Sequence, residues 1–359
     1  MNPLIPRPDP IPLPAPAWLL EAILVFTLFL HLLPMSLLMG GGTLTVISEF
    51  LGRRDGRHRR LAQTTARLLP VLVAFTITLG IAPLLFLQVV YGPLFFSSSI
   101  LMAWPWLSIV GMMLVGYYGY YWHSFQFERL GRRAVWVTLA STALFTTIGL
   151  LFTSNMVLML TPARWGTLYM TGRSGLHWDL AEPTVLPRFL HIFVASLALS
   201  GLGIAILGAA KARADTTFGA WVRQYGLRWF VAATWLQFAV GLWFLASLPP
   251  SIRSLFLGGG ALETALLVAA LSLAVISLMT IQHWITIGTA AILGTVALMA
   301  VIRHRLRAAY LASEFDPTQL AVQPQIAVFA LFVVILLCGI AAIAWMVWKF
   351  ALVTGPRPE

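Results

Sequence analysis

Four histidines lie within or at the edges of long apolar segments of this sequence: His31, His123, His191 and His283. An imidazole surrounded by lipid is costly unless a partner satisfies its nitrogens, so ionisable residues at such positions are candidates for functional sites. The partner can be a haem iron or a hydrogen-bonding group of a neighbouring helix. His31 and His191 lie well inside their segments, and we regard both as candidate haem ligands. His123 and His283 lie beside tryptophans near segment ends, which favours anchoring in the headgroup region.

Two polar residues accompany the candidate ligands. Arg188 precedes His191 by three residues and can pair with a haem propionate or, alternatively, reach lipid phosphates. Asn155 lies in an apolar segment and needs a partner there, which can be helix backbone, a propionate or a quinone carbonyl. We therefore expect a cofactor site that includes His31, His191, Arg188 and Asn155.

Small residues and methionines complete the candidate site. Gly42 shares a helical face with His31, and Ala195 and Ala198 share one with His191. Such residues leave room for a flat macrocycle, or simply let helices pack closely. A methionine thioether can serve as a second axial ligand, although a methionine in a span is more often a packing residue. The candidates are Met35, Met156, Met159 and Met279.

The composition is that of a membrane protein. Apolar residues form 59% of the chain and charged residues 10%, whereas about 25% of a soluble domain is charged. Nine apolar runs of about 18 residues or more predict nine transmembrane helices, and hence an all-α polytopic bundle. The runs are 18–47, 67–92, 99–123, 134–160, 187–210, 228–248, 263–281, 285–302 and 325–348.

The net charge of +11 is explained by the positions of the basic residues between the predicted spans and does not indicate nucleic-acid binding. With the N-terminus outside, the segments 49–67, 125–133 and 211–228 and the C-terminal end face the cytoplasm. These segments hold most of the lysines and arginines, which predicts an N-out, C-in orientation. The Arg303–Arg307 cluster falls on the outer side, where we expect a solvated helix end or, alternatively, a basic patch for an acidic partner.

The sequence predicts one membrane domain. Residues 1–17 are expected to form a proline-rich extended arm without a cleavable signal pattern, and residues 18–352 a single bundle. The bundle consists of a four-helix part, 18–160, and a second part, 188–352. Between them, the external loop 161–187 is rich in aromatic and polar residues and is expected to pack across the bundle mouth. The single cysteine excludes a disulfide, and no Cys-x-x-Cys-His motif is present for covalent haem attachment.

Acidic residues are scarce near the predicted spans. Glu21 and Glu263 lie at outer ends, and no aspartate or glutamate is expected deep within a helix. A proton-driven transporter normally needs such a carboxylate, so that class of protein is disfavoured.

Several of these segments resemble subunit I of the cytochrome bd quinol oxidases. Glu182-Pro-Thr-Val-Leu-Pro-Arg-Phe-Leu-His191 is similar to the start of that family's fifth span, whose histidine ligates the low-spin b haem. Leu30-His31-Leu-Leu-Pro34 resembles the motif of the first span, whose histidine serves a high-spin haem. The segments 49–92 and 153–162 are similar to the family's first loop with its second span and to the end of its fourth span. The resemblance covers about residues 20–245 in the same order, and it implies haem ligation by His191 and His31.

The chain also departs from this family. Its third span, over Ser108–Tyr121, has no glutamate, and the short segment Pro249–Ala261 replaces the extended quinol-binding loop. The methionine that pairs with the histidine of the fifth span has no counterpart at the corresponding place in the seventh. We therefore expect no oxygen reduction by this chain alone.

The resemblance and the departures together predict a membrane b-haem subunit of a quinol-linked electron-transfer complex. It would hold one or two haem b groups, take quinol as substrate and work in the bacterial inner membrane. Its partners would be other membrane subunits and a redox protein such as a cytochrome at the outer face. The alternatives are a true quinol:oxygen terminal oxidase subunit and a haem-free membrane anchor for a peripheral redox enzyme.

Overall fold

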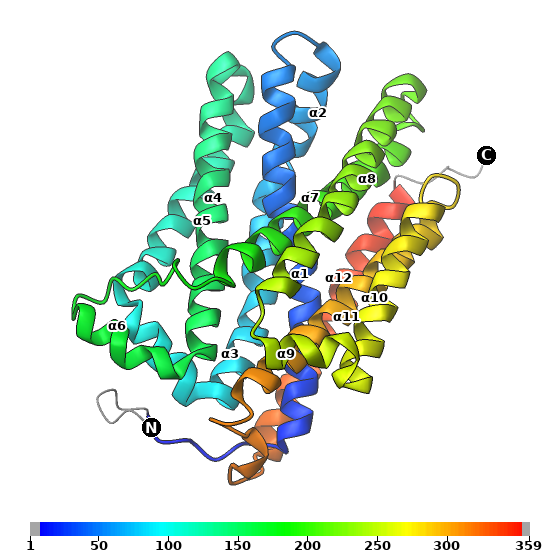
Figure 1. Ribbon diagram of the computed structural model, residues 1–359. Coiled ribbons are helices and arrows are strands. Elements are labelled where there is room, and N and C mark those ends of the chain that lie inside the picture. The colour runs from blue at the N-terminus through cyan, green and yellow to red at the C-terminus, as the bar shows by residue number, and fades with distance from the viewer. Residues whose placement is uncertain (1–7, 354–359) are drawn as a thin grey trace.

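The computed structural model describes residues 8–353, which form helices and their connections (Figure 1). Residues 1–7 of the predicted arm lie outside this range. Among the described residues the only β-type pairing is an isolated parallel bridge between Leu13 and Val322. The α-helices are α1 (Ala17–Leu51), α2 (Gly56–Ala66), α3 (Leu69–Leu101), α4 (Ala103–Leu130), α5 (Ala134–Leu160), α6 (Trp165–Thr171), α7 (Val185–Lys211), α8 (Thr216–Ser247), α9 (Pro250–Ser254), α10 (Ala261–Thr280), α11 (Ile285–Leu311) and α12 (Ile326–Val353). Short 3-10 turns cover Gly131–Arg133, Pro162–Arg164 and Pro317–Gln319, and a π turn covers Leu255–Gly259.

The helix lengths agree with the nine predicted spans. Within residues 8–353, eight continuous helical stretches are long and apolar enough to cross a membrane. One of them, 103–160, would be about 87 Å long as a straight helix, nearly three times the thickness of a hydrocarbon core. It is divided at Gly131, where a φ of 51° ends α4 before α5 begins. Nine long helices result in this part of the chain, and the all-α polytopic architecture is confirmed.

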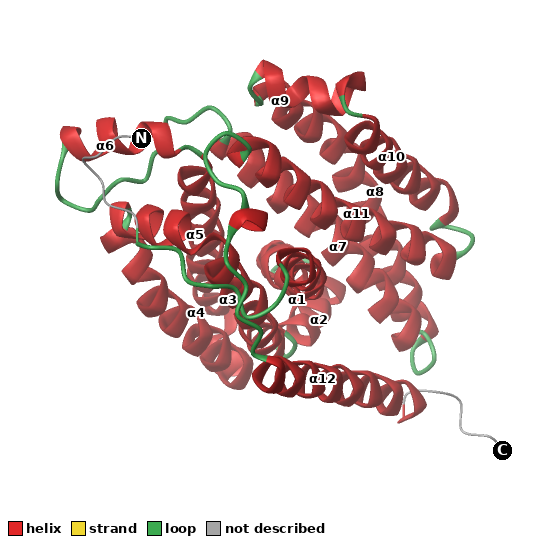
Figure 2. Ribbon diagram, turned by 90° about the horizontal axis from the view of Figure 1, so that it is seen from below, coloured by secondary structure: helices red, strands yellow, loops and turns green. Residues whose placement is uncertain are grey.

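The central helix of the bundle is α1. Figure 2, viewed along the bundle, shows α3, α5, α7 and α11 around it, and all four pack against it. α12 lies at the edge of the same view and has one face on α3, where the rings of Phe332 and Phe86 are 5.0 Å apart. Groups carried at mid-height on α1 are therefore enclosed by helices from both predicted parts of the bundle.

Helix pairs approach closely where small residues face each other. At the contact of α7 with α8, a Cβ on Gly201 would lie 2.5 Å from the backbone nitrogen of Phe230, and one on Gly226 would lie 2.4 Å from that of Ala205. Only glycine fits such a backbone approach, which allows van der Waals contact along the helices. Ala198, predicted to leave room for a macrocycle, is buried in the same hydrophobic cluster as Phe230, so that expectation was wrong for Ala198.

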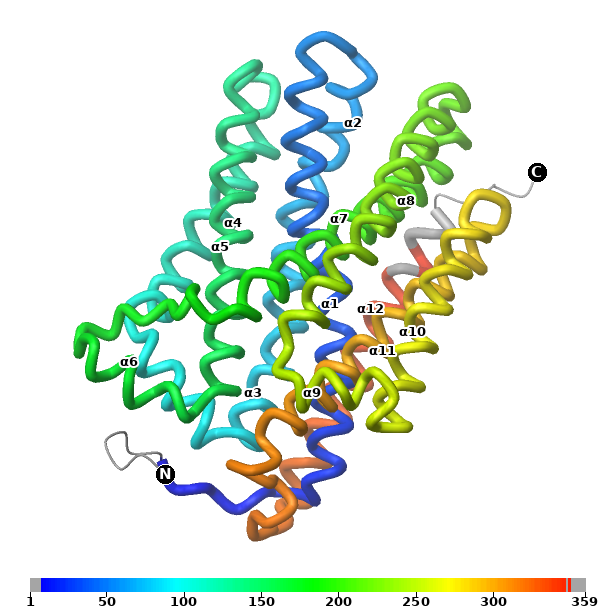
Figure 3. The backbone as a smooth tube through the Cα atoms, in the orientation of Figure 1, coloured from blue at the N-terminus to red at the C-terminus, as the bar shows by residue number. Residues whose placement is uncertain are grey.

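The connections at one end of the bundle pack on the helices (Figure 3). In the arm, Leu13 is fully buried and its backbone N–H donates to Ala321 O at 2.8 Å. The loop 161–187 contains α6, and its backbone bonds to the ends of α3 and α4 through His177 N to Leu101 O and Trp104 N to Gly175 O. The expectation that this loop packs on the bundle is confirmed.

Two aspartates begin helices at the opposite end. Asp55 accepts a hydrogen bond from Arg57 N at 2.9 Å at the start of α2, and Asp215 accepts one from Phe218 N at 3.0 Å at the start of α8. Asp215 also accepts a hydrogen bond from Arg60 Nη1 at 2.5 Å, and this bond joins α2 to the turn between α7 and α8. The hydrogen bond from Arg60, followed by that from the Phe218 backbone, lowers the pKa of Asp215 to about 2.

Several helices extend past the apolar runs that predicted them. α8 begins at Thr216 although its run begins at 228, and α11 continues to Leu311 although its run ends at 302. Hydropathy marks the residues suited to lipid, whereas a helix continues as long as its backbone bonds and packing are favourable. The Arg303–Arg307 cluster therefore lies within a packed helix, and not at a solvated helix end.

Candidate functional site

A cavity of about 380 Å³ lies between α1, α3, α4, α5, α7 and α11. Aliphatic, aromatic and methionine side chains form most of its wall. Its ionisable lining residues are His31 of α1 and Arg303 and Arg307 of α11, and none of the lining residues is an aspartate or glutamate. The volume falls in the range of pockets that bind small molecules, and a few polar groups in an apolar wall are typical of such pockets.

His31 is held in one orientation within this cavity. Its Nδ1 lies 3.0 Å from the backbone oxygen of Thr76, and because a carbonyl only accepts, Nδ1 carries the ring proton in this bond. Nε2 then has a free lone pair, and no group among the described residues bonds to it. A histidine that donates one nitrogen to a carbonyl and leaves the other unprotonated has the usual arrangement of a metal-binding imidazole.

Gly80 of α3 provides the space beside this ring. A Cβ at Gly80 would lie 2.8 Å from Cε1 and 2.9 Å from Nδ1 of His31. Gly42, which the sequence suggested for this role, is elsewhere: a Cβ there would lie 2.5 Å from Tyr120 Oη. The expectation for Gly42 was wrong because it considered the face of α1 alone and not the helices that pack on it.

Three arginines bring positive charge to the half of the bundle that contains the start of α7 and the end of α11. Arg303 and Arg307 line the cavity, and Arg303 is subject to electrostatic repulsion from both Arg307 and Arg188. Arg307 is 5% exposed, and its Nη1 has no hydrogen-bond partner among the described residues. Arg188 has two such nitrogens, Nε and Nη2, and its guanidinium lies over the ring of Phe244 at 5.1 Å.

Few carboxylates compensate these arginines. Glu21 interacts electrostatically with Arg307 and accepts a hydrogen bond from Tyr91 at 2.8 Å, and Glu182 bonds to the start of α7. Buried guanidinium groups are expensive unless an anion pairs with them. The arrangement therefore suits an anionic ligand beside His31.

His191 does not line this cavity, and its ring lies between α7 and α8. Gln237 Nε2 is 2.9 Å from both the Nδ1 and the backbone oxygen of His191, and a Cβ on Gly241 would lie 3.2 Å from its Cε1. With this amide orientation Nδ1 accepts and the proton is on Nε2, whereas an imidazole bound to iron through Nε2 needs that nitrogen unprotonated. Rotation of the Gln237 amide would let Nδ1 donate, but it would also set the amide oxygen against the backbone oxygen of His191, which cannot donate. Haem ligation by His191 stays a prediction.

Asn155 is completely buried and its partners are side chains of α3. Its Oδ1 accepts from Ser98 Oγ at 3.2 Å, and its Nδ2 donates to Ser99 Oγ at 3.3 Å. Two serine hydroxyls thus satisfy the amide, in place of the helix backbone, propionate or quinone carbonyl expected from the sequence. The side chain joins α5 to α3 and does not line the cavity.

The candidate methionines separate into two groups. Met35 and Met156 line the cavity beside His31, together with Met39 and Met113. Met159 is buried in the hydrophobic core, and Met279 is 72% exposed, so a ligand role for Met279 is wrong.

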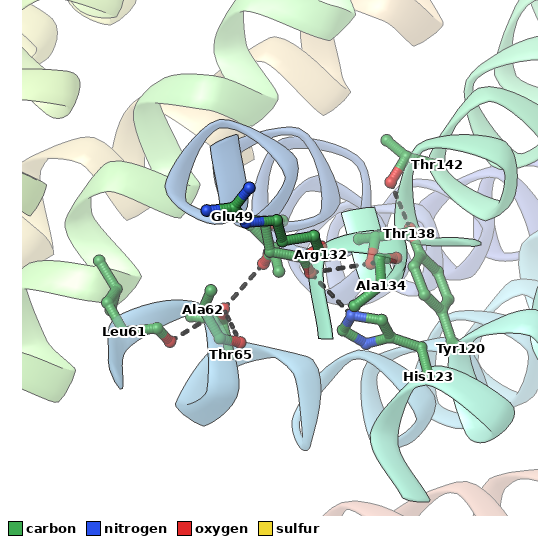
Figure 4. Close-up of polar contacts among 12 residues, drawn as sticks. Glu49, Leu61, Ala62, Thr65, Tyr120, His123, Arg132, Ala134, Thr138 and Thr142 are labelled. Atoms are coloured by element: carbon green, nitrogen blue, oxygen red, sulfur yellow. Dashed lines mark hydrogen bonds and ion pairs between the residues drawn. The ribbon is translucent and has the colours of Figure 1, made fainter. Parts of the chain in front are cut away.

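A buried carboxylate lies at the other end of α1 (Figure 4). Glu49 is 8% exposed, and its Oε1 is 2.7 Å from Nε2 of the completely buried His123 and accepts from Thr138 Oγ1 at 2.9 Å. The expectation that His123 is an interfacial anchor was therefore wrong. Glu49, expected in the cytoplasmic segment 49–67, lies instead in the last turn of α1 and is buried there. His283 is exposed in the turn 281–284. Glu49 is about 27 Å along α1 from His31, too far to take part in chemistry at the cavity.

The sequence contained a signal for the residues that were missed. Arg303 and Arg307 are four positions apart, which places them on one helical face, and Glu49 follows an apolar run by two residues. The arginine pair and Glu49 were assigned to positions outside the spans because the apolar runs stop just before them. Extending each helix by two turns would have placed them inside the bundle.

Comparisons with known proteins identify the fold. No protein-family model matches the chain, and no curated protein matches it by sequence. Among solved structures, the chain is similar to the bd oxidase from Geobacillus thermodenitrificans, with a TM-score of 0.65 over 94% of this chain and 99% of that one. The sequences are 12% identical, so the likeness is one of fold. The protein is thus a multi-pass membrane protein with a bd oxidase-like helical bundle.

Proposed function

We propose that the chain is a membrane b-haem subunit of a quinol-linked electron-transfer complex. It would pass electrons between membrane quinol and a partner redox protein. The observation that carries this proposal is that one cavity wall brings together the imidazole of His31, with a free Nε2, and the guanidinium groups of Arg303 and Arg307. The Nη1 of buried Arg307 has no hydrogen-bond partner among the described residues.

A haem b fits the residues present. His31 would supply an axial nitrogen, and Arg303 and Arg307 would pair with the two propionates, whose negative charge the buried cations need. Gly80 leaves room beside the ligand ring, and the apolar wall would exclude water. A bound haem b supplies a one-electron carrier. A second haem at His191, with Arg188 as propionate partner, belongs to the same proposal.

The cavity favours electron transfer over oxygen reduction. Reduction of oxygen consumes protons, and none of the residues that line the cavity is a carboxylic acid that could deliver them. Quinol-dependent oxygen consumption by the purified protein, together with a chlorin haem in its spectrum, would instead identify a terminal oxidase. Complete absence of haem from protein made in haem-replete cells would identify a membrane anchor.

The proposed location is the bacterial inner membrane, with quinone and the redox partner bound at the outer face. The loop 161–187 leads into α7, whose first turn contains Arg188, and it lies in the same half of the bundle as the end of α11 (Figure 1). It packs on α3 and α4 through backbone hydrogen bonds and can cover a binding site at this end. Other membrane subunits would complete the complex.

The test is a reduced-minus-oxidised spectrum of detergent-purified protein. We expect a b-type band in the wild type, a large loss of haem in His31→Ala, and full haem content in His283→Ala, whose ring is exposed. His191→Ala tests the second haem. Wild-type haem content in both His31→Ala and His191→Ala would refute haem ligation by these residues.

A further inference from the structure

A groove of about 650 Å³ opens on the surface where α8 meets the turn between α10 and α11. Its polar lining consists of Arg223, Gln224 and Arg228 of α8 and Gln282 of the turn, and Leu227 and Val231 form its apolar part. Arg223 Nη2 donates to the backbone oxygen of Gln282 at 3.1 Å and so holds the turn against α8. The groove is separate from the cavity that contains His31 and shares none of that cavity's lining residues.

Within residues 8–353, no ion pair joins the arginines of this groove to a carboxylate. Neither α8 nor the connection 281–284 contains an aspartate or glutamate. Glu263 of α10 bonds to Arg305 near the opposite end of the bundle, and Asp215 bonds to Arg60. Arg228 is exposed and makes no hydrogen bond to any described residue. Two guanidinium groups therefore face the surroundings with their donors largely free.

The groove lies at the level of a membrane surface. Gln282 belongs to the turn that ends two apolar helices, and α8 continues beyond this turn in Figure 1. Trp284 in the turn is exposed, as expected for a tryptophan in the interfacial region of a bilayer. Trp235 is seven residues from Arg228, on the same face of α8 and about 10 Å deeper in the bilayer.

We propose that this groove binds an anionic diacyl phospholipid. The phosphate lies between Arg223 and Arg228, with Gln224 available to the polar headgroup, and an acyl chain follows Leu227, Val231 and Trp235. Basic pockets at the ends of spanning helices recognise anionic headgroups through charge, and the apolar face below them distinguishes a lipid from free phosphate. The proposal is independent of whether the chain binds haem.

The test is native mass spectrometry of the whole detergent-purified protein titrated with phosphatidylglycerol or with phosphatidylcholine of the same acyl chains. We expect tighter binding of phosphatidylglycerol. Since each arginine near an anionic lipid contributes about a factor of five, Arg228→Gln should weaken this binding about fivefold and the double change with Arg223→Gln about 25-fold. Arg54→Gln, at an exposed arginine of the same end of the bundle, should leave it unchanged.

Arg228→Gln is the decisive variant because its side chain makes no hydrogen bond within the described protein, so the fold does not depend on it. Its lipid-free thermal unfolding should match that of the wild type. Equal binding of both lipids by the wild type, or undiminished phosphatidylglycerol binding by Arg228→Gln, would overturn the proposal. So would inorganic phosphate at millimolar concentration displacing the lipid completely, because the groove would then be a phosphate site.

Discussion

Replacement of Gly80 by alanine is the sharpest perturbation of the proposed haem site. The added methyl carbon would lie 2.8 Å from Cε1 of His31, whereas non-bonded carbons are comfortable at about 3.5 Å or more. The imidazole, or one of α1 and α3, must move by about 0.7 Å. Metal-binding geometry tolerates only about 0.5 Å, so the axial bond should weaken.

The size of the effect follows from the cost of overpacking. Extra methyl groups in a close-packed interior cost about 1–3 kcal/mol, which corresponds to a loss of haem affinity of about 5- to 150-fold. Alanine also favours the helix over glycine by roughly 1 kcal/mol, so the protein without haem should not lose stability to the same extent. Gly80→Ala should therefore yield folded protein that contains little haem.

The assay is transfer of haem from the purified protein to excess apomyoglobin, monitored by absorbance, together with the reduced-minus-oxidised spectrum. Gly111→Ala of α4 is the matched control, because no atom lies within 4 Å of the Cβ it adds. Wild-type haem retention and an unchanged spectrum in Gly80→Ala would refute the assignment of His31. An equal loss in Gly111→Ala would show that the effect is not local.

Three further predictions concern regions outside the cavity. Glu49→Ala should lower the free energy of unfolding by about 3–5 kcal/mol, because it leaves the buried His123 unpaired. Glu128→Ala, at an exposed ion pair, should cost less than about 1 kcal/mol. Thermal unfolding of both variants in detergent measures the difference. The pKa of Asp215 is lowered from 3.8 to about 2 by Arg60, so this pair stabilises the fold above pH 3.8 and its contribution is lost as the pH falls towards 2. The difference in Tm between wild type and Asp215→Asn should accordingly shrink over that interval, and a constant difference would contradict the assignment. A cysteine at exposed Ser174, in a cysteine-free background, should react with an impermeant maleimide added to intact cells if the N-terminus is outside, and protection there would reverse the predicted orientation.

Much of the fold could be predicted because it depends on local composition. Each apolar run predicted a long helix, and the external loop 161–187 was expected to pack because its aromatic residues are too apolar for a free loop. His31 was found for the same reason: an imidazole inside an apolar run is conspicuous in any sequence. These features can be predicted from the preference of single residues for lipid or water alone.

The remaining parts of the candidate site required the tertiary structure. Gly80 is one of many glycines in the sequence, and only the packing of α3 on α1 places it against the ring of His31. The sequence predicted that Asn155 belongs to the cofactor site, whereas in the structure its side chain forms hydrogen bonds with two serines of α3.

The sequence by itself determined that this protein is a bundle of membrane-spanning helices with histidines inside it, because transfer of a side chain from water to lipid depends on that side chain alone. Tertiary structure decided that Arg303 and Arg307 face the cavity of His31 and that Glu49 meets His123. The reason is that a charged side chain inside a helix bundle is stabilised by partners that other helices supply. Which partner it meets depends on contacts between residues far apart in the chain.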